Sequence, residues 1–560
     1  MEAEADAQQR SIDELRVLSI PERVAKGRAI DGLCESGEIE PKTVRFRCAA
    51  NDARFRAGDM VCLSRGDPRV EKLATGTLAA VEDIFVDIAI TNGRVSPGMD
   101  QLVLDEDTLD LTGTYKKAIA KAADLSRGRD RIIPLLMGRL SPSGPSATDL
   151  MQIPSLVKEG FTLRQAEAIV YATTTDLCHL IQGPPGTGKT RVIARIVRAL
   201  VEQNPRARIL VTSFTHRAID NALAEILVHG FDRNRLAKIA QTQPDSDLPW
   251  FPAFRNSPWA GGDRGPYLIG ATPFALHSRL DGVEFDWVIV DEASQVTLPL
   301  AVMAMLGGER WIFAGDHKQM PPVTLTCRPA EAIQASVFGR LQSGGYSTML
   351  ETTYRMNDQL TAWPSTAFYG GDLAANERSG KRRLVLPSIP PAFADIFAPE
   401  HPSIFLRLQH WGEKTSSPTE IRWLAELICA LDAVGFPLSE VGVVVPYRRQ
   451  ARLLRNELTR RGLAAEKRRA LVADTVERMQ GQGREIVLVS LTTSDPAFAN
   501  LLGDFLFQEE RLNVAITRCK TKLIVLASAA WLQDFPRAIE AKFKFAGFES
   551  FLRSCHIVDR

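Results

Sequence analysis

Short, largely apolar segments recur along the central and C-terminal parts of the chain, separated by segments of helical periodicity. These apolar segments are Leu180-Ile181, Trp287–Val290, Trp311–Ala314, Val441–Val445, Ile486–Ser490 and Leu523–Leu526. Runs of this length are typical of parallel strands covered by helices on both faces. The pattern therefore predicts an α/β protein with two tandem parallel-sheet domains, over residues 155–345 and 346–540.

The first 150 residues follow a different pattern. Residues 9–35 have a helical period, residues 43–112 alternate apolar and polar positions around turns, and residues 115–140 return to a helical period. We predict a helical part over residues 1–40, a small β-barrel over 41–112, and a helix with a linker over 113–154. Residues 541–560 are expected to form a C-terminal tail. An unrelated oligomerisation domain is the alternative for the N-terminal part.

Composition narrows the class of protein. The 68 basic and 67 acidic side chains nearly cancel, so any nucleic acid must be held by a local groove. The eight cysteines contain no C-x-x-C pair, which argues against a zinc ribbon, an iron–sulfur cluster or a disulfide scaffold. No apolar run approaches the ~20 residues of a membrane span, and the N-terminus is acidic. We expect a cytoplasmic protein that needs no membrane and acts as a monomer.

The segment between the strand at Leu180-Ile181 and the following helix fits the phosphate-loop pattern G-x-x-x-x-G-K-[ST]. Its residues are Gly183, Pro184, Pro185, Gly186, Thr187, Gly188, Lys189 and Thr190. The glycines let backbone N–H groups surround phosphates at the N-terminus of a helix. Lys189 is expected to reach the β- and γ-phosphates, and the Thr190 hydroxyl to bind Mg²⁺. The chain is therefore predicted to bind ATP with Mg²⁺.

Two later strands end in polar residues that suit hydrolysis. Asp291 and Glu292 follow Trp287–Val290, and Gln319 follows Trp311–Ala314. Asp291 is predicted to hold Mg²⁺, and Glu292 to deprotonate the attacking water. Because ligands gather at strand ends of such sheets, Gln319 is a candidate γ-phosphate sensor.

The second half repeats the strand–helix alternation without a second phosphate loop, but it carries arginines beside its strands. Arg355 and Arg518 are the candidates to stabilise charge on the γ-phosphate from a second lobe. We therefore expect a catalytic cleft between two lobes.

In order along the chain, these motifs resemble superfamily 1B helicases of the Upf1/Dna2/SMUBP-2-like (DNA2/NAM7) family. The resemblance covers roughly residues 155–535 and rests on Gln165, Gly183–Thr190, Ser213–Asn221, Leu268–Thr272, Asp291–Gln295, Gly315–Gln319, Tyr354–Met356, Val445–Gln450 and Arg511–Arg518. It implies two RecA-like domains preceded by a barrel and a helical stalk. It also implies adenine contacts for Gln165 and Tyr354, and nucleic-acid contacts for Thr215, Thr272, Tyr447 and Thr475.

By this resemblance the chain is expected to be a 5′→3′ helicase or translocase that hydrolyses ATP on single-stranded DNA or RNA. An ATP-gated nucleic-acid clamp or remodelling factor without processive unwinding is the alternative. An AAA+ or transporter-type ATPase is disfavoured, because those proteins build the site between subunits or lack the arginine motifs within one chain. The motifs do not distinguish DNA from RNA, since that choice depends on contacts with the 2′-hydroxyl.

Two positions depart from the family pattern. Thr353 stands where the family usually has Gln before Tyr-Arg, and Gly483 stands where it usually has a Glu that contacts the nucleotide sugar. Glu485 lies two residues further on, and strand alternation would place it on the same side as residue 483. We expect Glu485 to lie too far away to replace that contact, so that the site tolerates dATP.

Overall fold

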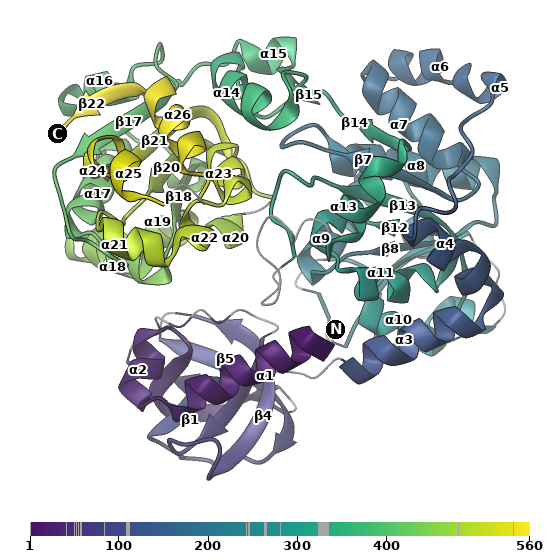
Figure 1. Cartoon of the computed structure of the whole chain (residues 1–560), viewed down its shortest axis with the longest axis horizontal. Coiled ribbons are helices and arrows are strands. Elements are labelled where there is room, and N and C mark those ends of the chain that lie inside the picture. Colours follow the sequence, from purple (N-terminus) through teal and green to yellow (C-terminus); the bar gives the residue numbers. More distant parts are fainter. Residues whose placement is uncertain are drawn as a thin grey trace.

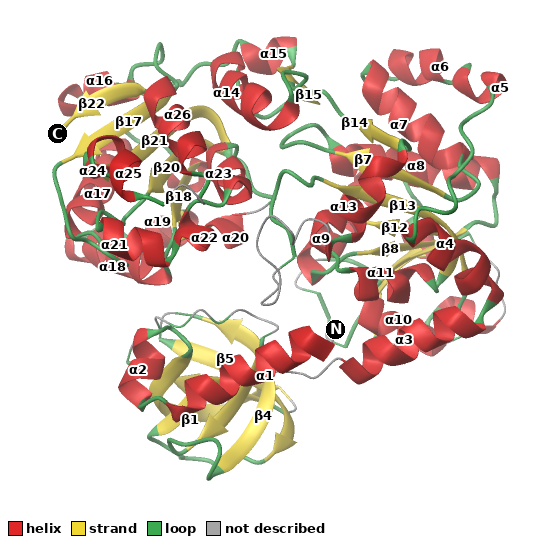
Figure 2. Cartoon of the chain, in the orientation of Figure 1, coloured by secondary structure: helices red, strands yellow, loops and turns green. Residues whose placement is uncertain are grey.

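The computed structural model describes residues 1–560 except 1, 41, 50, 52, 54, 56–58, 83, 108–111, 242, 245–246, 262–265, 281, 323–334, 480 and 541–542. Cys327 and Gln480 thus lie outside the described residues. A small barrel and two α/β lobes are seen side by side in Figure 1, with the strands of all three in yellow in Figure 2. Within the described residues, no helix has the length and apolarity needed to cross a membrane.

The barrel is closed and antiparallel, with strand order β1-β2-β5-β4-β3-β6. Its strands are β1 (Ala29–Glu40), β2 (Thr43–Arg47), β3 (Met60–Ser64), β4 (Lys72–Val81), β5 (Phe85–Gly93) and β6 (Leu102–Glu106). Two helices precede it, α1 (Glu2–Val17) and α2 (Ile20–Ala25). Helix α1 lies along the barrel, where Ile12 and Leu15 are buried and the Arg16 guanidinium contacts the Asp107 carboxylate at 2.8 Å.

The predicted helical part over residues 1–40 is wrong at its C-terminal end. Helix α2 ends at Ala25, and β1 of the barrel begins at Ala29 rather than at residue 41. Gly27 and Gly32 have φ angles of 69° and 66°, and a right-handed helix cannot continue through such residues. The two glycines were the available signal against a helix here.

Lobe 1 is built on a parallel sheet with strand order β10-β9-β11-β8-β12-β13-β7-β14. In chain order its main elements are α7 (Leu163–Thr174), β7 (Cys178–Gln182), α8 (Lys189–Gln203), β8 (Arg208–Thr212), α9 (His216–Val228), β9 (Leu236–Ile239), β10 (Trp250–Phe251), β11 (Tyr267–Gly270), α10 (Pro273–Ser278), β12 (Phe285–Val290), α11 (Leu298–Met305), β13 (Gly308–Gly315), α13 (Val337–Leu341) and β14 (Ser347–Met349). The strands and the helix predicted around the phosphate loop are confirmed. Hydrophobic cores lie on both faces of this sheet, as its apolar strands require.

The segment predicted as a separate stalk helix and linker includes helices that belong to the face of lobe 1. Helices α3 (Thr112–Asp124) and α4 (Ile133–Leu136) bury Ala118, Ala122 and Leu135 in the core that covers β12 and β13. Two short helices, α5 (Ala147–Leu150) and α6 (Ile153–Lys158), then lead to α7. Alanines at helical spacing allow α3 to pack closely on α11.

Lobe 2 carries a second parallel sheet with strand order β19-β18-β20-β21-β17-β22. Its main elements are β15 (Thr352–Thr353), α14 (Asp358–Tyr369), β16 (Ala374–Ala375), α15 (Glu377–Gly380), α16 (Ala394–Phe397), β17 (Ser403–Leu408), α17 (Pro418–Ala433), β18 (Val441–Val445), α18 (Arg448–Arg460), α19 (Ala465–Ala470), β19 (Val472–Thr475), α20 (Val476–Met479), β20 (Arg484–Ser490), α21 (Pro496–Leu501), α22 (Gly503–Leu506), α23 (Glu509–Ile516), β21 (Cys519–Ser528), α24 (Ala530–Gln533), α25 (Phe535–Ala538), α26 (Phe545–Ser554) and β22 (His556–Asp559). The three predicted strands of this half are confirmed as β18, β20 and β21.

Two predicted boundaries of lobe 2 are wrong. Strand β14 pairs with β7, so lobe 1 extends past residue 345 to Met349. The predicted tail over 541–560 includes α26 and β22, and β22 pairs with β17 at the edge of the second sheet. Phe548, Phe551 and Leu552 of α26 are buried in the core of lobe 2, so hydrophobic burial fixes this segment to the lobe.

Candidate active site and nucleic-acid interface

The phosphate loop joins β7 to α8 and is held in shape by backbone contacts. Gly186 and Gly188 have φ angles of 75° and 78°, which glycine adopts without strain. The Gly183 N–H donates to the carbonyl of Gly315 at 2.8 Å, and a Cβ on Gly183 would lie only 3.0 Å from the Lys189 side chain. The Thr187 hydroxyl donates to the Pro184 carbonyl at 2.8 Å, which closes the loop on itself. The backbone angles and the close packing therefore favour glycine at these positions, independently of the motif.

The predicted catalytic lysine and both acidic residues meet in space. The Lys189 ammonium lies 3.3 Å from the Asp291 carboxylate and 3.0 Å from the Glu292 carboxylate. Burial alone would lower the pKa of Lys189, but the two carboxylates outweigh it and raise that pKa. Glu292 has a φ of 52°, a left-handed conformation that is rare for a residue other than glycine and that marks functional sites. The Asp291 and Glu292 carboxylates therefore face Lys189 at the end of the phosphate loop.

The donor set at this point fits Mg²⁺. Thr190 stands in the first turn of α8 and offers a hydroxyl, while Asp291 follows β12 and offers a carboxylate that is 5% exposed. Such hard oxygen ligands are the ones that Mg²⁺ takes alongside phosphates and water. Burial raises the pKa of Asp291, opposed by the Lys189 charge, so a second cation would stabilise the ionised form.

Gln319, Arg355 and Arg518 converge across the two lobes. Arg518 Nη2 donates to Gln319 Oε1 at 3.2 Å, and Arg355 Nη1 donates to the Thr517 carbonyl at 3.1 Å. Burial lowers the pKa of both arginines, and for Arg518 the neighbouring Arg355 charge adds to that effect. Within the described part of the chain, neither guanidinium has a carboxylate at ion-pairing distance. Arg518 is buried and Arg355 is half-buried, so the pair forms a partly enclosed positive centre suited to an anion.

The predicted adenine-contacting residues lie against the phosphate loop. Gln165 is buried; its Nε2 donates to the Thr187 carbonyl at 2.9 Å, and its Oε1 accepts from the N–H of Thr162 at 3.0 Å. It thus completes a capping box at the start of α7 while it supports the loop. The half-buried Tyr354 donates its backbone N–H to the Gly186 carbonyl at 2.8 Å. Both residues are placed where a base could lie next to the loop.

The four predicted nucleic-acid contacts lie in two pairs at carboxyl ends of strands. Thr215 and Thr272 are the N-caps of α9 and α10, after the paired strands β8 and β11 of lobe 1. Tyr447 precedes α18, and Thr475 ends β19, whose partner β18 leads to Tyr447. Thr215 is exposed and Thr272 and Thr475 are half-buried, but Tyr447 is 9% exposed and its hydroxyl lies 3.1 Å from that of Thr493. Tyr447 therefore offers little of its ring for stacking in this conformation.

The sequence does not indicate the contacts that several polar residues make between the lobes. Thr353 contacts the phosphate loop, and Asp316, Tyr369 and Asn513 form hydrogen bonds beside Gln319. Phe214, next to Thr215, is 55% exposed and offers an aromatic face at the same edge. An aromatic residue beside a motif can be recognised in the sequence, whereas the contact between Asp316 and Tyr369 cannot be inferred from it.

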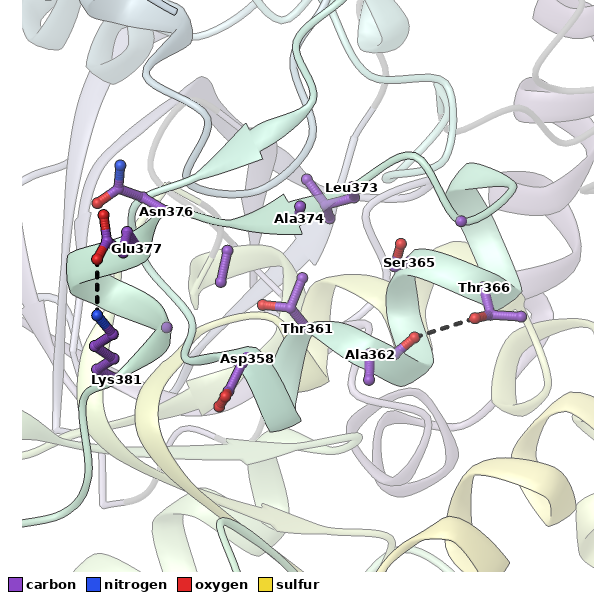
Figure 3. A pocket seen from close by; sticks show the side chains of 13 residues that line it. Asp358, Thr361, Ala362, Ser365, Thr366, Leu373, Ala374, Asn376, Glu377 and Lys381 are labelled. Carbon is purple, nitrogen blue, oxygen red and sulfur yellow. Dashed lines mark hydrogen bonds and ion pairs between the residues drawn. The ribbon is translucent and has the colours of Figure 1, made fainter.

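A cavity lies on lobe 2, away from the ATP site. It has a volume of about 560 Å³ and is lined by residues of α14, β16 and α15, with Asp358, Thr361 and Asn376 among them (Figure 3). An ion pair between Lys381 and Glu377 at 2.7 Å borders it. Its wall strand β16 pairs with β15, which carries Thr353.

Two family models, each described as an AAA domain, match residues 165–325 and 333–530, which correspond to the two lobes. The DNA replication ATP-dependent helicase/nuclease DNA2 of Mus musculus is 27% identical over 86% of this chain and 48% of its own length. The protein of the same name from Homo sapiens is 28% identical over 88% of this chain and 50% of its own, and that from Saccharomyces cerevisiae 28% over 79% and 30%. These matches support the resemblance to Upf1/Dna2-like helicases of superfamily 1 that the motifs indicate.

The chain spans about half the length, or less, of the relatives it matches. Among solved structures, the arterivirus nonstructural protein 10 helicase aligns with a TM-score of 0.42 and 12% identity, over 90% of this chain and 80% of that one.

Proposed function

We propose that this chain is an ATP-dependent helicase that translocates 5′→3′ on a nucleic-acid single strand. One observation carries the proposal: the buried Arg518 of lobe 2 donates a hydrogen bond to Gln319 of lobe 1, with the half-buried Arg355 beside it. Neither arginine has a carboxylate at ion-pairing distance among the described residues. A site divided in this way is completed only when the lobes approach each other. Hydrolysis is then coupled to the relative motion of the lobes.

The residues have separable tasks in this proposal. Lys189 neutralises phosphate charge, and Arg355 and Arg518 stabilise the charge that develops on the γ-phosphoryl oxygens. Glu292 accepts the proton of the attacking water, and Gln319 orients the γ-phosphate. Thr190 and Asp291 would hold Mg²⁺, which supplies further charge neutralisation when it is bound. Because Lys189 contacts both carboxylates in the present conformation, binding of ATP and Mg²⁺ must exchange these ion pairs for phosphate and metal contacts.

In this proposal the nucleic-acid strand lies along the carboxyl ends of the strands of both sheets. Thr215 and Thr272 serve lobe 1, and Tyr447 and Thr475 serve lobe 2, with the exposed Phe214 as an added stacking surface. Hydroxyls, helix N-termini and aromatic faces can hold a strand without a large basic patch, which suits a net charge of +1. We propose single-stranded DNA as the first candidate, because the relatives named above are DNA replication helicases.

Strand displacement on tailed duplexes tests the proposal. A duplex with a 5′ single-stranded tail should be opened with ATP, its 3′-tailed mirror should stay intact, and Glu292→Gln should open neither while it still binds ATP. Lys189→Ala should weaken ATP binding itself. Opening of only the 3′-tailed duplex would overturn the direction.

The same assay distinguishes the clamp alternative. Nucleic-acid-stimulated hydrolysis with no displacement of either duplex would replace the helicase with an ATP-gated clamp. Binding of matched DNA and RNA single strands, with and without a non-hydrolysable ATP analogue, decides the nature of the track.

A further inference from the structure

A buried tyrosine hydroxyl connects the two lobes beside the γ-phosphate sensor. Tyr369 is the last residue of α14 in lobe 2 and is 4% exposed. Its hydroxyl donates to Asp316 Oδ2 of lobe 1 at 2.7 Å and accepts from Asn513 Nδ2 of α23 at 2.8 Å. Side chains from two other parts of the chain therefore meet at the Tyr369 hydroxyl.

The contacts continue to two of the residues predicted to act on the γ-phosphate, Gln319 and Arg518. Gln319 Nε2 donates to the same Asp316 oxygen at 2.8 Å, while Gln319 Oε1 accepts from Arg518. Asn513 Nδ2 also donates to the Lys318 carbonyl at 2.8 Å, next to Gln319 in the chain. The side-chain amide of Gln319 is thus held at one end by Asp316 and at the other by Arg518.

Tyr369 and Asp316 are both buried, and this burial determines how the tyrosine hydroxyl can act. Burial, with the Asp316 charge, raises the pKa of Tyr369 well above its ordinary value, so the hydroxyl keeps its proton and remains a donor. Asp316 is 1% exposed, so water cannot replace a lost donor on its carboxylate. Without the hydroxyl, Asp316 would seek other donors, and the Gln319 amide is the nearest one bound to it.

We propose that Tyr369 is a positioning residue for ATP hydrolysis, which orients Gln319 through Asp316 and links that orientation to lobe 2 through Asn513. The inference rests on the proposed function, since it needs Gln319 to act on the γ-phosphate. Tyr369 itself touches no reacting atom in this scheme. A purely structural role would reside in its ring, which packs in the lobe 2 core beside Phe368 with ring centroids 6.3 Å apart.

Tyr369→Phe separates the two roles because it keeps the ring and removes the hydroxyl. We expect kcat of the nucleic-acid-stimulated ATPase to fall about tenfold, with KM for ATP changed less than twofold, as for the loss of a hydrogen bond to a charged group that matters in the transition state. Tyr267→Phe is the matched control: Tyr267 is a buried tyrosine of β11 that neighbours Arg208, and its variant should keep kcat.

A double-variant cycle decides whether Tyr369 acts through Gln319. In a Gln319→Ala background, Tyr369→Phe should cost less than twofold more, because the group that it orients is gone. A full tenfold loss in that background, or an unchanged kcat in the single variant, would overturn the inference. If Tyr369→Phe does not fold, Asn513→Ala removes the donor on the other side of the hydroxyl, and the same cycle with Gln319→Ala applies. A wild-type protein without ATPase activity would instead contradict the proposed function.

Discussion

The Thr353 hydroxyl donates a hydrogen bond of 2.8 Å to the carbonyl oxygen of Pro185, in the middle of the phosphate loop. The next residue, Tyr354, binds the Gly186 carbonyl through its backbone, and a Cβ on Gly186 would lie 2.4 Å from the Cβ of Arg355. Strand β15 of lobe 2 thus rests directly on the loop that is expected to hold the phosphates. Thr353, which departs from the family pattern, therefore has a structural role in supporting the phosphate loop.

Thr353→Val should weaken ATP binding without a large change in kcat. Valine keeps the shape of threonine but leaves the Pro185 carbonyl without its donor, which costs about 0.5–1.5 kcal/mol, or roughly twofold to tenfold in affinity. Thr353→Ser keeps the hydroxyl and should bind ATP like the wild type. Titration with a fluorescent ATP analogue measures both. Equal affinities for the valine and serine variants would show that this hydrogen bond does not support the loop.

Arg355→Ala and Arg518→Ala should each bind ATP yet hydrolyse it on the order of 10²–10³-fold more slowly, since each removes charge needed in the transition state. Arg518 is buried and Arg355 is half-buried, and neither has a carboxylate at ion-pairing distance within the described residues, so their removal leaves no carboxylate without its partner. Single-turnover hydrolysis at saturating ATP measures the effect. A wild-type rate in either variant would exclude that arginine as a contributor from lobe 2.

The sequence predicted those parts of the site that are local in the chain. The phosphate loop, Asp291 and Glu292 each follow an apolar strand directly, so strand ends and motif spacing were enough to find them. The contact of Asp316 with Tyr369 spans 53 residues and two lobes, and nothing in either local pattern indicates it. For Gln165 the adenine contact implied by the family resemblance stays a prediction, and only the structure reveals its hydrogen bond to the Thr187 carbonyl.

The domain boundaries predicted from the sequence differ from those of the structure where the local sequence pattern is weak. Strand β22 has only four residues, and its place is fixed by pairing with β17, which lies some 150 residues earlier in the chain. The apolar spacing of β1 suits both a helix and a strand, whereas its glycines with positive φ angles exclude a continuous helix. Tertiary pairing decided both cases over local preference.

Lys522 should make the stability of lobe 2 depend on pH. Burial lowers the pKa of Lys522 from 10.5 to about 7, opposed only by Glu400, and its ammonium donates to the carbonyls of Ala398 and His401. Between pH 7 and 10 the unfolded chain holds this proton while the folded protein does not. The contribution to the free energy of unfolding therefore rises with pH in this window and is flat below it.

Denaturation at pH 7 and pH 9 measures this contribution, which should be on the order of 2 kcal/mol. Lys522→Met should abolish the rise. Lys520→Met, two residues away, loses only the partly exposed ion pairs with Glu440 and Glu485 and should retain it. A pH dependence that persists unchanged in Lys522→Met would assign it to another group.

Gly483 should leave the nucleotide site tolerant of dATP. Glu485 does not replace the missing carboxylate, because it contacts Lys520 and Thr521 at 3.2 Å, and the pairing of β20 with β21 shifts register between Arg484 and Ile486. That irregularity breaks the alternation that would have placed residues 483 and 485 on one side. We expect turnover of ATP and dATP within a fewfold of each other.

Gly483→Glu should create a preference for ATP of about tenfold, the typical effect of one hydrogen bond to a charged group. A Cβ at this position would lie 3.1 Å from Arg355 Nε, so the new carboxylate should also pair with Arg355 and lower kcat for both nucleotides. Gly483→Gln has the same reach without the charge and should keep kcat closer to that of the wild type. The kcat/KM ratio for ATP over dATP separates the sugar effect from the arginine effect. A wild-type protein that strongly rejects dATP would place the sugar contact on a residue other than 483, and an unchanged ratio in Gly483→Glu would show that this position does not face the sugar.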